Sequence, residues 1–305
     1  MKLKKMSSQT GMIHRRITMP RTRGENLNNL AALCVHILVM KQLIASALAV
    51  MGSCGISASA APSWFSDLST TVPGKHQGIA TQKLHYSLSW KGQLQAGHVT
   101  FVFGAKGSTN DIIAAQCYGG SQGFAAKLFP YQFDMSGKIN RTNLLPISMH
   151  CNETDREETQ VTTVQYSPSK VAVKEISRPH DTGKDEIKNI NFAFSPVFDA
   201  FSVMLLIRSH ELATGDTITQ VIHPFKSPYL AKITVLGREK ITGKDAIKLN
   251  VQMTKIMKDL SLKPYKKMKT STLWISDDED RIPLELRVDA FIGDVRMTLT
   301  EQRPL

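Results

Sequence analysis

The densest group of side chains that could do chemistry is a run of four acidic residues, Asp277-Asp278-Glu279-Asp280. Carboxylates can bind calcium, but a calcium loop alternates its ligands with spacers and needs a glycine for its sharp turn. This run is contiguous, and it lies between two strand-like segments. We therefore interpret it as a solvated hairpin turn.

A zinc motif begins at His210-Glu211 but is not completed. In H-E-x-x-H the second histidine lies four residues after the first, on the same helical face, and here that position is Thr214. The other histidines after residue 60 are scattered, with His85 and His98 falling on adjacent predicted strands. The sequence therefore predicts no catalytic residue, no metal site and no cofactor, and we interpret the chain as a non-enzyme.

Six lysines within fifteen residues form the most distinctive basic surface. They are Lys255, Lys258, Lys263, Lys266, Lys267 and Lys269. Ammonium groups at this density could meet phospholipid head groups or an anionic glycan in a peripheral membrane contact. Alternatively, they belong to a solvated hairpin loop whose charges discourage pairing of strand edges.

Charge and a targeting signal divide the chain near residue 60. Residues 1–60 hold eight Lys/Arg against one acid, which leaves 30 basic and 25 acidic residues in the remainder, a net of +5. From Met40, a lysine, a short apolar run and Ala58-Ser59-Ala60 follow in the order of a secretory signal peptide. We predict a leader over 1–60, with 1–39 an overextended start and 40–60 the signal peptide, and a single β-rich domain over 61–305.

Export agrees with the remaining cysteine pattern and predicts a periplasmic or outer-envelope location, where nucleic acid is not an expected partner. Cys117 and Cys151 follow the leader and could form one disulfide in an oxidising compartment, or remain two buried thiols. A rival cleavage signal at 51–54 would place a lipidated Cys54 at the mature N-terminus.

The elements after residue 80 read mostly as short strands. Leu84, Tyr86, Leu88 and Trp90 alternate with polar residues, which indicates a strand with one buried face. About a dozen such segments favour an antiparallel sheet that curls into an incomplete barrel, because strongly twisted sheets of that size rarely stay flat. A short helix is expected over 123–129 and an apolar helix over 195–208, and 179–187 is expected to be an exposed loop.

Several phrases in a fixed order carry a family resemblance. They are Leu84-x-Tyr86-x-Leu88-x-Trp90-x-Gly92, then Phe198-Asp199-Ala200-Phe201-Ser202 with Leu206-Ile207-Arg208, and finally Leu273-Trp274-Ile275-Ser276-Asp277 with Arg281-Ile282-Pro283-Leu284. From 84 to 299 the chain resembles domain-of-unknown-function family 3108, a group of exported bacterial proteins. The resemblance implies a β-rich fold similar to the half-barrel of lipoprotein carriers, with a helical lid.

The fold class expected is therefore mainly β: a curved antiparallel sheet of about 10–12 strands, with the apolar helix and the short helix packed on its concave face. We expect non-catalytic binding of an apolar or lipid-like ligand there. The alternative is a structural module that contacts an envelope protein or polysaccharide. The candidate cavity residues are Tyr86, Trp90, Phe101, Phe201, Leu205 and Trp274, although ordinary core packing would use the same side chains.

Overall fold

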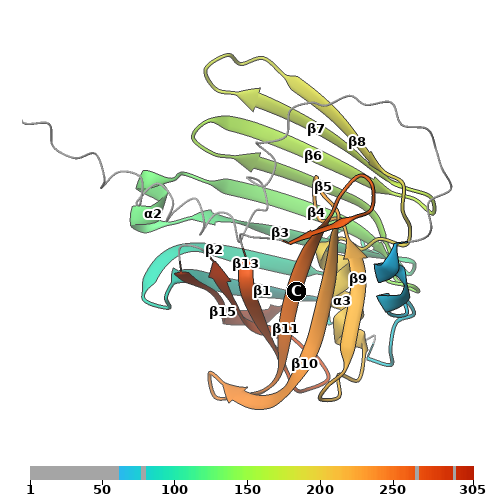
Figure 1. Cartoon of the computed structure of the whole chain (residues 1–305). Helices are drawn as coiled ribbons and strands as arrows, with labels where there is room; N and C mark the ends of the chain where they lie inside the picture. The colour runs from blue at the N-terminus through green and yellow to red at the C-terminus, as the bar shows by residue number, and fades with distance from the viewer. Residues whose placement is uncertain (1–61, 77–79, 265–267, 291–292) are drawn as a thin grey trace, which may run out of the picture.

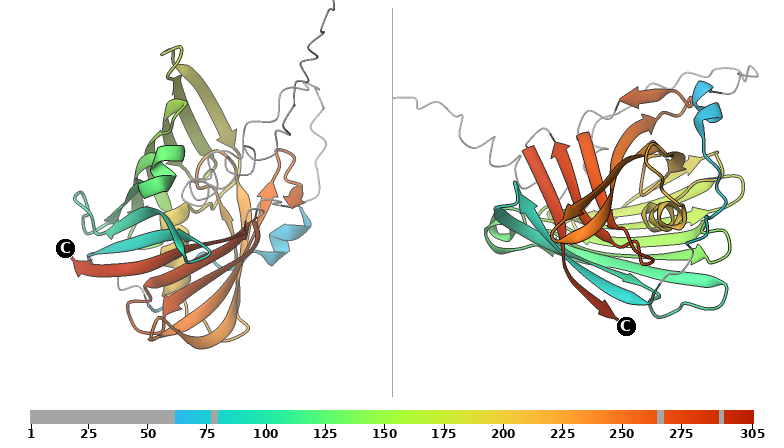
Figure 2. Two further views of the ribbon diagram at one scale, coloured as in Figure 1. Left: turned by 90° about the vertical axis from the view of Figure 1, so that its left-hand side faces the viewer. Right: turned by 90° about the horizontal axis from the view of Figure 1, so that it is seen from below.

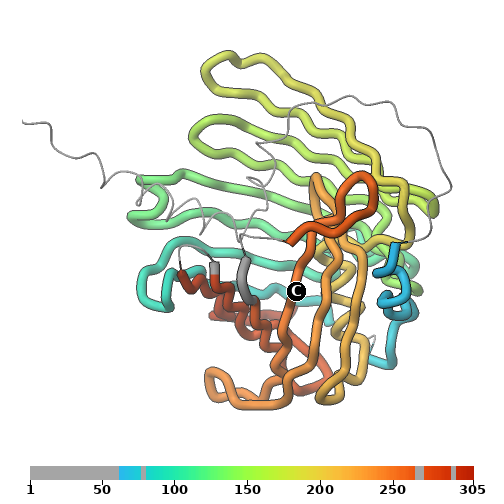
Figure 3. The backbone as a smooth tube through the Cα atoms, viewed as in Figure 1, coloured from blue at the N-terminus to red at the C-terminus, as the bar shows by residue number. Residues whose placement is uncertain are grey.

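One curved antiparallel sheet forms nearly the whole molecule (Figure 1). The computed structural model describes residues 62–76, 80–264, 268–290 and 293–305. Fourteen strands follow one another in the order β8-β7-β6-β5-β4-β3-β2-β1-β15-β14-β13-β11-β10-β9, and a short β12 pairs with β11. The backbone tube shows how the strands from β1 to β8 turn back one beside the next (Figure 3). The expected fold class, a curved antiparallel sheet not closed into a barrel, is confirmed.

The strands are bounded as follows: β1 Gln82–Trp90, β2 Leu94–Phe103, β3 Ile112–Ser121, β4 Gln132–Asn140, β5 Pro146–Thr154, β6 Glu158–Tyr166, β7 Val171–Pro179, β8 Glu186–Phe192, β9 Thr217–Ile222, β10 Tyr229–Ile241, β11 Lys244–Ile256, β12 Leu262–Pro264, β13 Met268–Ser276, β14 Pro283–Ala290 and β15 Gly293–Pro304. The helices are the 3-10 helix η2 Ser63–Asp67 and the α-helices α2 Gly123–Leu128 and α3 Ala200–Ser209. None of the helices in the described part of the chain is long and apolar enough to span a membrane.

The strand count exceeds the expected 10–12 chiefly because β8 was not foreseen. Its first four residues, Glu186 to Asn189, are all exposed, so the hydrophobic alternation that marks a half-buried strand is missing there. β8 pairs only with β7 and forms one edge of the sheet. Charged side chains are typical of edge strands, where they discourage pairing with other chains.

The apolar helix α3 lies inside the curve of the sheet (Figure 2). It begins at Ala200, later than the expected 195, because Asp199 is its N-cap. Ser202 donates its backbone N–H to the Asp199 side chain, and the Ser202 hydroxyl accepts from the Asp199 backbone N–H, which completes a capping box. Before the helix, Phe198 forms a parallel bridge with Ile222 of β9.

The short helix was expected on the concave face, and that expectation is wrong. α2 contributes no buried residue, and Phe124 is 63% exposed. In Figure 1 it lies at the left of the molecule, against β2 and β3, whereas β9 and α3 lie at the right. Six residues make too short a helix to present a complete apolar face, so α2 is only a connection between β3 and β4.

The core fills the concave side in two adjoining clusters. One cluster joins β1–β7 to α3 through residues such as Tyr86, Phe133 and Phe201. The other joins β9–β11 and β13 to the opposite flank of α3, for example through Leu206 and Leu249. Because both flanks of the helix are covered, its nearly all-round apolar sequence is accounted for.

Candidate functional site

Four of the predicted cavity residues do meet on the concave face. Tyr86 and Phe101 have ring centroids 5.7 Å apart, and Phe201 of α3 lies 6.5 Å from Phe101, each pair edge to face. Leu205 belongs to the same cluster, one helical turn after Phe201. These side chains therefore attach α3 to β1 and β2.

A glycine on β4 makes this close approach possible. A Cβ atom at Gly137 would lie 2.8 Å from Cδ2 of Phe201. The Phe201 ring also lies edge to face with Phe103, at a centroid distance of 6.4 Å. The ring thus occupies the space that a side chain at position 137 would need, and this part of the concave face is packed core.

The Tyr86 hydroxyl shows how tightly that core is closed. It donates to the backbone carbonyl of Pro283 at 2.8 Å, and burial raises the pKa of the phenol far above its usual range. Tyr86 and Phe201 are only 2% and 1% exposed. A ligand could reach these residues only if α3 moved.

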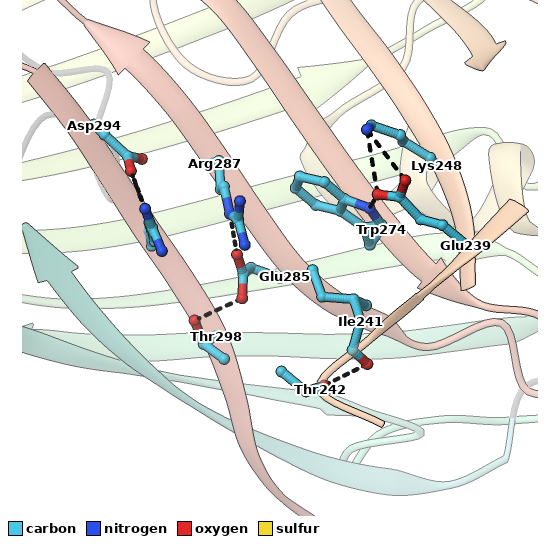
Figure 4. Close-up of polar contacts among 10 residues, drawn as sticks. Glu239, Ile241, Thr242, Lys248, Trp274, Glu285, Arg287, Asp294 and Thr298 are labelled. Carbon is cyan, nitrogen blue, oxygen red and sulfur yellow. Dashed lines mark hydrogen bonds and ion pairs between the residues drawn. The ribbon is translucent and has the colours of Figure 1, made fainter. Parts of the chain in front are cut away.

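The two tryptophans do not join the cluster, which corrects the predicted cavity. Trp274 lies on the opposite face of β13 from Leu273 and Ile275, both of which contact the α3 side. Its indole N–H donates to Glu239 at 2.7 Å, and its ring is flanked by Lys248 and Arg287 (Figure 4). Alternation along a strand sends neighbouring side chains to opposite faces, so Trp274 stabilises the outer face.

Trp90 ends β1 and is half-buried at the rim of the sheet. Lys91 lies over its ring at 4.7 Å from the centroid. A Cβ atom at Gly293, the first residue of β15, would lie 3.3 Å from the indole nitrogen of Trp90. Trp90 therefore belongs to a hairpin end, away from the Phe101–Phe201 contact.

A pocket of about 290 Å³ opens elsewhere on the molecule, at the ends of β4–β7. Its wall combines the turn between β4 and β5, the turn between β6 and β7, and the segment that leads into α3. The lining residues are Asn140, Asn143, Leu145, Pro146, Ile147, Tyr166, Ser167, Pro168, Val171, Ser195, Pro196 and Val197. None of the predicted cavity residues is among them.

The pocket is apolar in character because most of its polar groups are already engaged. The Asn140 side chain accepts from the backbone N–H groups of Thr142 and Asn143, and Asn143 in turn accepts from Leu145. The Ser167 hydroxyl donates to the Lys170 carbonyl. The side chains left to contact a guest are chiefly Tyr166, Val171, Val197 and the prolines.

Behind the pocket lies a buried carboxyl group that sequence reasoning treated only as a helix residue. Asp199 is 0% exposed, and its Oδ2 has no hydrogen-bond partner. Burial raises its pKa to about 6, although the hydrogen bonds from Ser202 act in the opposite direction. The nearby Tyr166 hydroxyl donates to the carbonyl of His223 at 2.8 Å.

The acidic run is a hairpin turn, as expected, and it also holds the end of α3. Arg281 follows the run and donates to the backbone carbonyls of His210 and Glu211, just after the helix. In return, Arg208 of α3 donates to the carbonyl of Asp280. A cation at a helix C-terminus also interacts favourably with the helix dipole. These reciprocal hydrogen bonds of Arg281 and Arg208 therefore fix α3 against the sheet.

The sequence does contain one pattern that could suggest a nucleophile, because Gly119-Gly120-Ser121-Gln122-Gly123 matches G-x-S-x-G. The motif lies at a strand-to-helix turn, as the chemistry would require. However, Ser121 Oγ accepts from the backbone N–H of Tyr131 at 3.0 Å, and it makes no hydrogen bond to a histidine within the described part of the chain. Its role is to pair the ends of β3 and β4.

Of the two alternatives for Cys117 and Cys151, the structure contains two buried thiols rather than a disulfide. Cys117 on β3 and Cys151 on β5 both lie opposite Met135, with β4 between them. Two strand spacings of about 4.8 Å separate the backbones by about 10 Å. Disulfides need Cα atoms within about 7 Å, so the sheet register keeps the two sulfurs from bonding.

The lysine cluster is described only in part. Lys255 on β11 lies directly opposite Lys263 on β12, and burial together with this like charge lowers the pKa of Lys255. Lys258 is exposed in the connecting turn, whereas Lys266 and Lys267, and the side chain of Lys269, lie outside the described residues. The role of the cluster at a membrane or glycan stays a prediction.

No group of three His, Cys, Asp or Glu side chains that could hold a metal occurs in the described part of the chain. His210 follows α3 as its C-cap residue.

The leader, with its cleavage site and Cys54, lies outside the described residues.

A family model described as "Protein of unknown function (DUF3108)" matches residues 85–300. None of the curated proteins matches the sequence. Among solved structures, the chain is similar to a beta-barrel-like protein of the DUF1849 family from Brucella abortus, with a TM-score of 0.49, 6% identity, and coverage of 74% of this chain and 98% of the other. It is also similar to the lipoprotein LppX of Mycobacterium tuberculosis, with a TM-score of 0.21, 13% identity, and coverage of 73% and 86%.

Proposed function

This chain belongs to the DUF3108 family of proteins of unknown function, and we propose that it is an exported envelope protein that binds an apolar or lipid-like ligand without catalysis. The signal sequence at 40–60 supports export to the periplasm or outer envelope. The ligand would enter the pocket at the ends of β4–β7, and the aromatic cluster around Phe201 would be the rigid wall behind it.

The observation that carries the proposal is the pocket itself. At about 290 Å³ it lies just below the usual range of about 300–1,000 Å³ for small-molecule sites, but an apolar cavity of about 150 Å³ is enough to take up benzene. Its polar groups are largely engaged in turns, so an apolar guest would leave few of them without partners.

The groups that could suggest catalysis have structural duties. The acidic turn holds α3, Ser121 pairs two strand ends, and His210 caps a helix. Each is therefore better explained without a reaction, which supports binding over hydrolysis.

A second candidate function, contact with an envelope protein or polysaccharide, is favoured by the β8 edge. Ile187 on this strand is 57% exposed, and β8 has a neighbour on one side only within the described sheet. A partner strand could add to such an edge by backbone hydrogen bonds.

A matched pair of substitutions tests the leading proposal. Val197→Phe adds a ring inside the pocket, whereas Ile187→Phe introduces the same ring on β8. Calorimetric titration with laurate, below its micelle concentration, should give saturable binding to the wild type and to I187F. Binding to V197F should be at least about tenfold weaker, which corresponds to about 1.4 kcal/mol. Equal binding to both variants would remove the pocket as the site.

A further inference from the structure

The concave face of β5, β6 and β7 changes character along the strands. Near the pocket it is apolar, with Val164 of β6 paired opposite Val173 of β7. Two residues farther from the pocket, Thr162 lies opposite Glu175. Another two residues along, Gln160 lies between Glu153 of β5 and Ser177 of β7.

This polar end of the concave face is buried. Gln160 and Thr162 are 0% and 1% exposed, and Glu153, Glu175 and Ser177 are at most 5% exposed. Directly opposite residues on paired strands have Cβ atoms about 5 Å apart. The five side chains therefore form one compact group, which we call the polar end.

Two members of the polar end lack hydrogen-bond partners. Both the Nε2 and the Oε1 of Gln160 are without a partner, and so is the Thr162 hydroxyl. A buried polar group left unsatisfied costs about 1–3 kcal/mol, and proteins rarely leave several together without a functional reason. The arrangement therefore offers an amide donor, an amide acceptor and a hydroxyl to a guest molecule.

The charges around these groups restrict what the guest can be. Tyr131 donates its hydroxyl to Glu153 at 2.7 Å. Lys226, from the loop after β9, forms an ion pair with Glu175, and Lys188 lies 4.0 Å from the same carboxylate. Because both lysines pair with Glu175, neither is left to neutralise a phosphate or carboxylate guest, which would also lie close to the buried carboxylate of Glu153.

We infer that the polar end binds a neutral, hydroxyl-rich group such as a sugar or glycerol moiety. Neighbouring hydroxyls both donate and accept, so one hydroxyl can accept from Gln160 Nε2 while another donates to Oε1. The Thr162 hydroxyl and the carboxylate oxygens supply further partners. The inference goes beyond the proposed function, because it concerns a second position on the concave face. Four residues of β6, at about 3.3 Å each, separate this position from the pocket, which gives a distance of about 13 Å along the strand.

The test compares two adjacent threonines on β6 in the full chain. Thr162 faces the polar end, whereas Thr163 faces outward and contacts His150 at 3.3 Å. Maltose is titrated into the 15N-labelled protein, and the side-chain amide resonance of Gln160, assigned through Gln160→Leu, is followed. We expect a saturable shift in the wild type and in T163V. In T162V the dissociation constant should rise about five- to tenfold, as expected for one buried hydrogen bond.

Two further probes separate the sources of such a group and its charge. Dodecyl maltoside, used below its micelle concentration, carries the same head on an alkyl chain, and glucose 6-phosphate adds an anion to glucose. A lipid-borne group would be indicated if dodecyl maltoside binds more tightly than maltose and if V197F removes this difference in affinity. Equal binding of the two probes would indicate a free sugar. Glucose 6-phosphate should bind more weakly than glucose.

The outcomes are distinguishable from failure of the proposed function. Loss of laurate binding alone would remove the apolar pocket and leave the polar end standing. No saturable maltose shift, or equal effects of T162V and T163V, would show that the polar end encloses only water and would overturn the inference.

Discussion

Gly137→Ala is expected to destabilise the protein through its contact with α3. Glycine in a strand interior normally costs about 0.5–1 kcal/mol relative to alanine, so this change would stabilise an open strand. Here the new Cβ would lie 2.8 Å from Cδ2 and 3.2 Å from Cε2 of Phe201. Because Phe201 is 1% exposed and contacts Phe101 and Phe103, its ring cannot move aside. Overpacking of this kind costs about 1–3 kcal/mol.

The assay is thermal and urea unfolding of wild type, G137A, Phe201→Leu and the double variant. A loss of about 2 kcal/mol should lower Tm by about 4–8 °C. In the F201L background, which removes the clashing ring edge, the cost of G137A should shrink by at least about 1 kcal/mol. Ser136→Ala, on the exposed side of β4, is the control and should change little. An equal cost of G137A in both backgrounds would refute the placement of α3.

Three other predictions follow from individual side chains. The pKa of Asp199 rises from 3.8 to about 6 on folding, so the native state loses about 3 kcal/mol of stability as pH rises from about 4 to 6. The D199N variant keeps a capping oxygen but does not titrate, so it should flatten that pH dependence in urea unfolding. An unchanged pH profile would contradict this prediction. Arg281→Met should remove the hydrogen bonds to the chain after α3 and lower the free energy of unfolding by about 2–4 kcal/mol. Faster amide hydrogen exchange confined to α3 would support this prediction, whereas native-like protection of α3 would contradict it. Alkylation in denaturant without reductant, followed by peptide mapping, should find Cys117 and Cys151 as separate alkylated thiols, whereas a linked peptide would contradict the sheet register.

Alternating patterns made most of this fold predictable. β1 could be found because Leu84, Tyr86 and Leu88 face the core while their neighbours face outward. The apolar helix was recognisable because nearly every residue from Phe201 to Ile207 is hydrophobic. β8 escaped because an edge strand covered with charged and polar groups does not show the alternation of a half-buried strand.

The candidate site was less predictable, because it depends on contacts between distant segments. Sequence alone indicated that Phe101 and Phe201 are inward, but not that they would fill the space between sheet and helix. Trp274 has the same hydrophobic character, and only the register of β13 sends it to the outer face. The pocket arises where two turns meet the segment around Val197, and turn residues such as Asn143 carry no periodic signal that would mark them as lining.

The polar end illustrates the same difficulty. In sequence, Gln160 and Thr162 look like ordinary members of a half-exposed strand, because their alternation with Val161 and Thr163 does not say which face is buried. Only pairing with Glu153 and Glu175 shows that the polar set faces inward.

The most direct test of the central claim is native mass spectrometry of the protein purified gently from the cell envelope. If the pocket holds a lipid-like ligand, we expect a discrete adduct of lipid mass on the wild type and on I187F, removed by organic extraction and absent from V197F. A wild-type spectrum at the bare chain mass, with no laurate adduct after incubation, would contradict it.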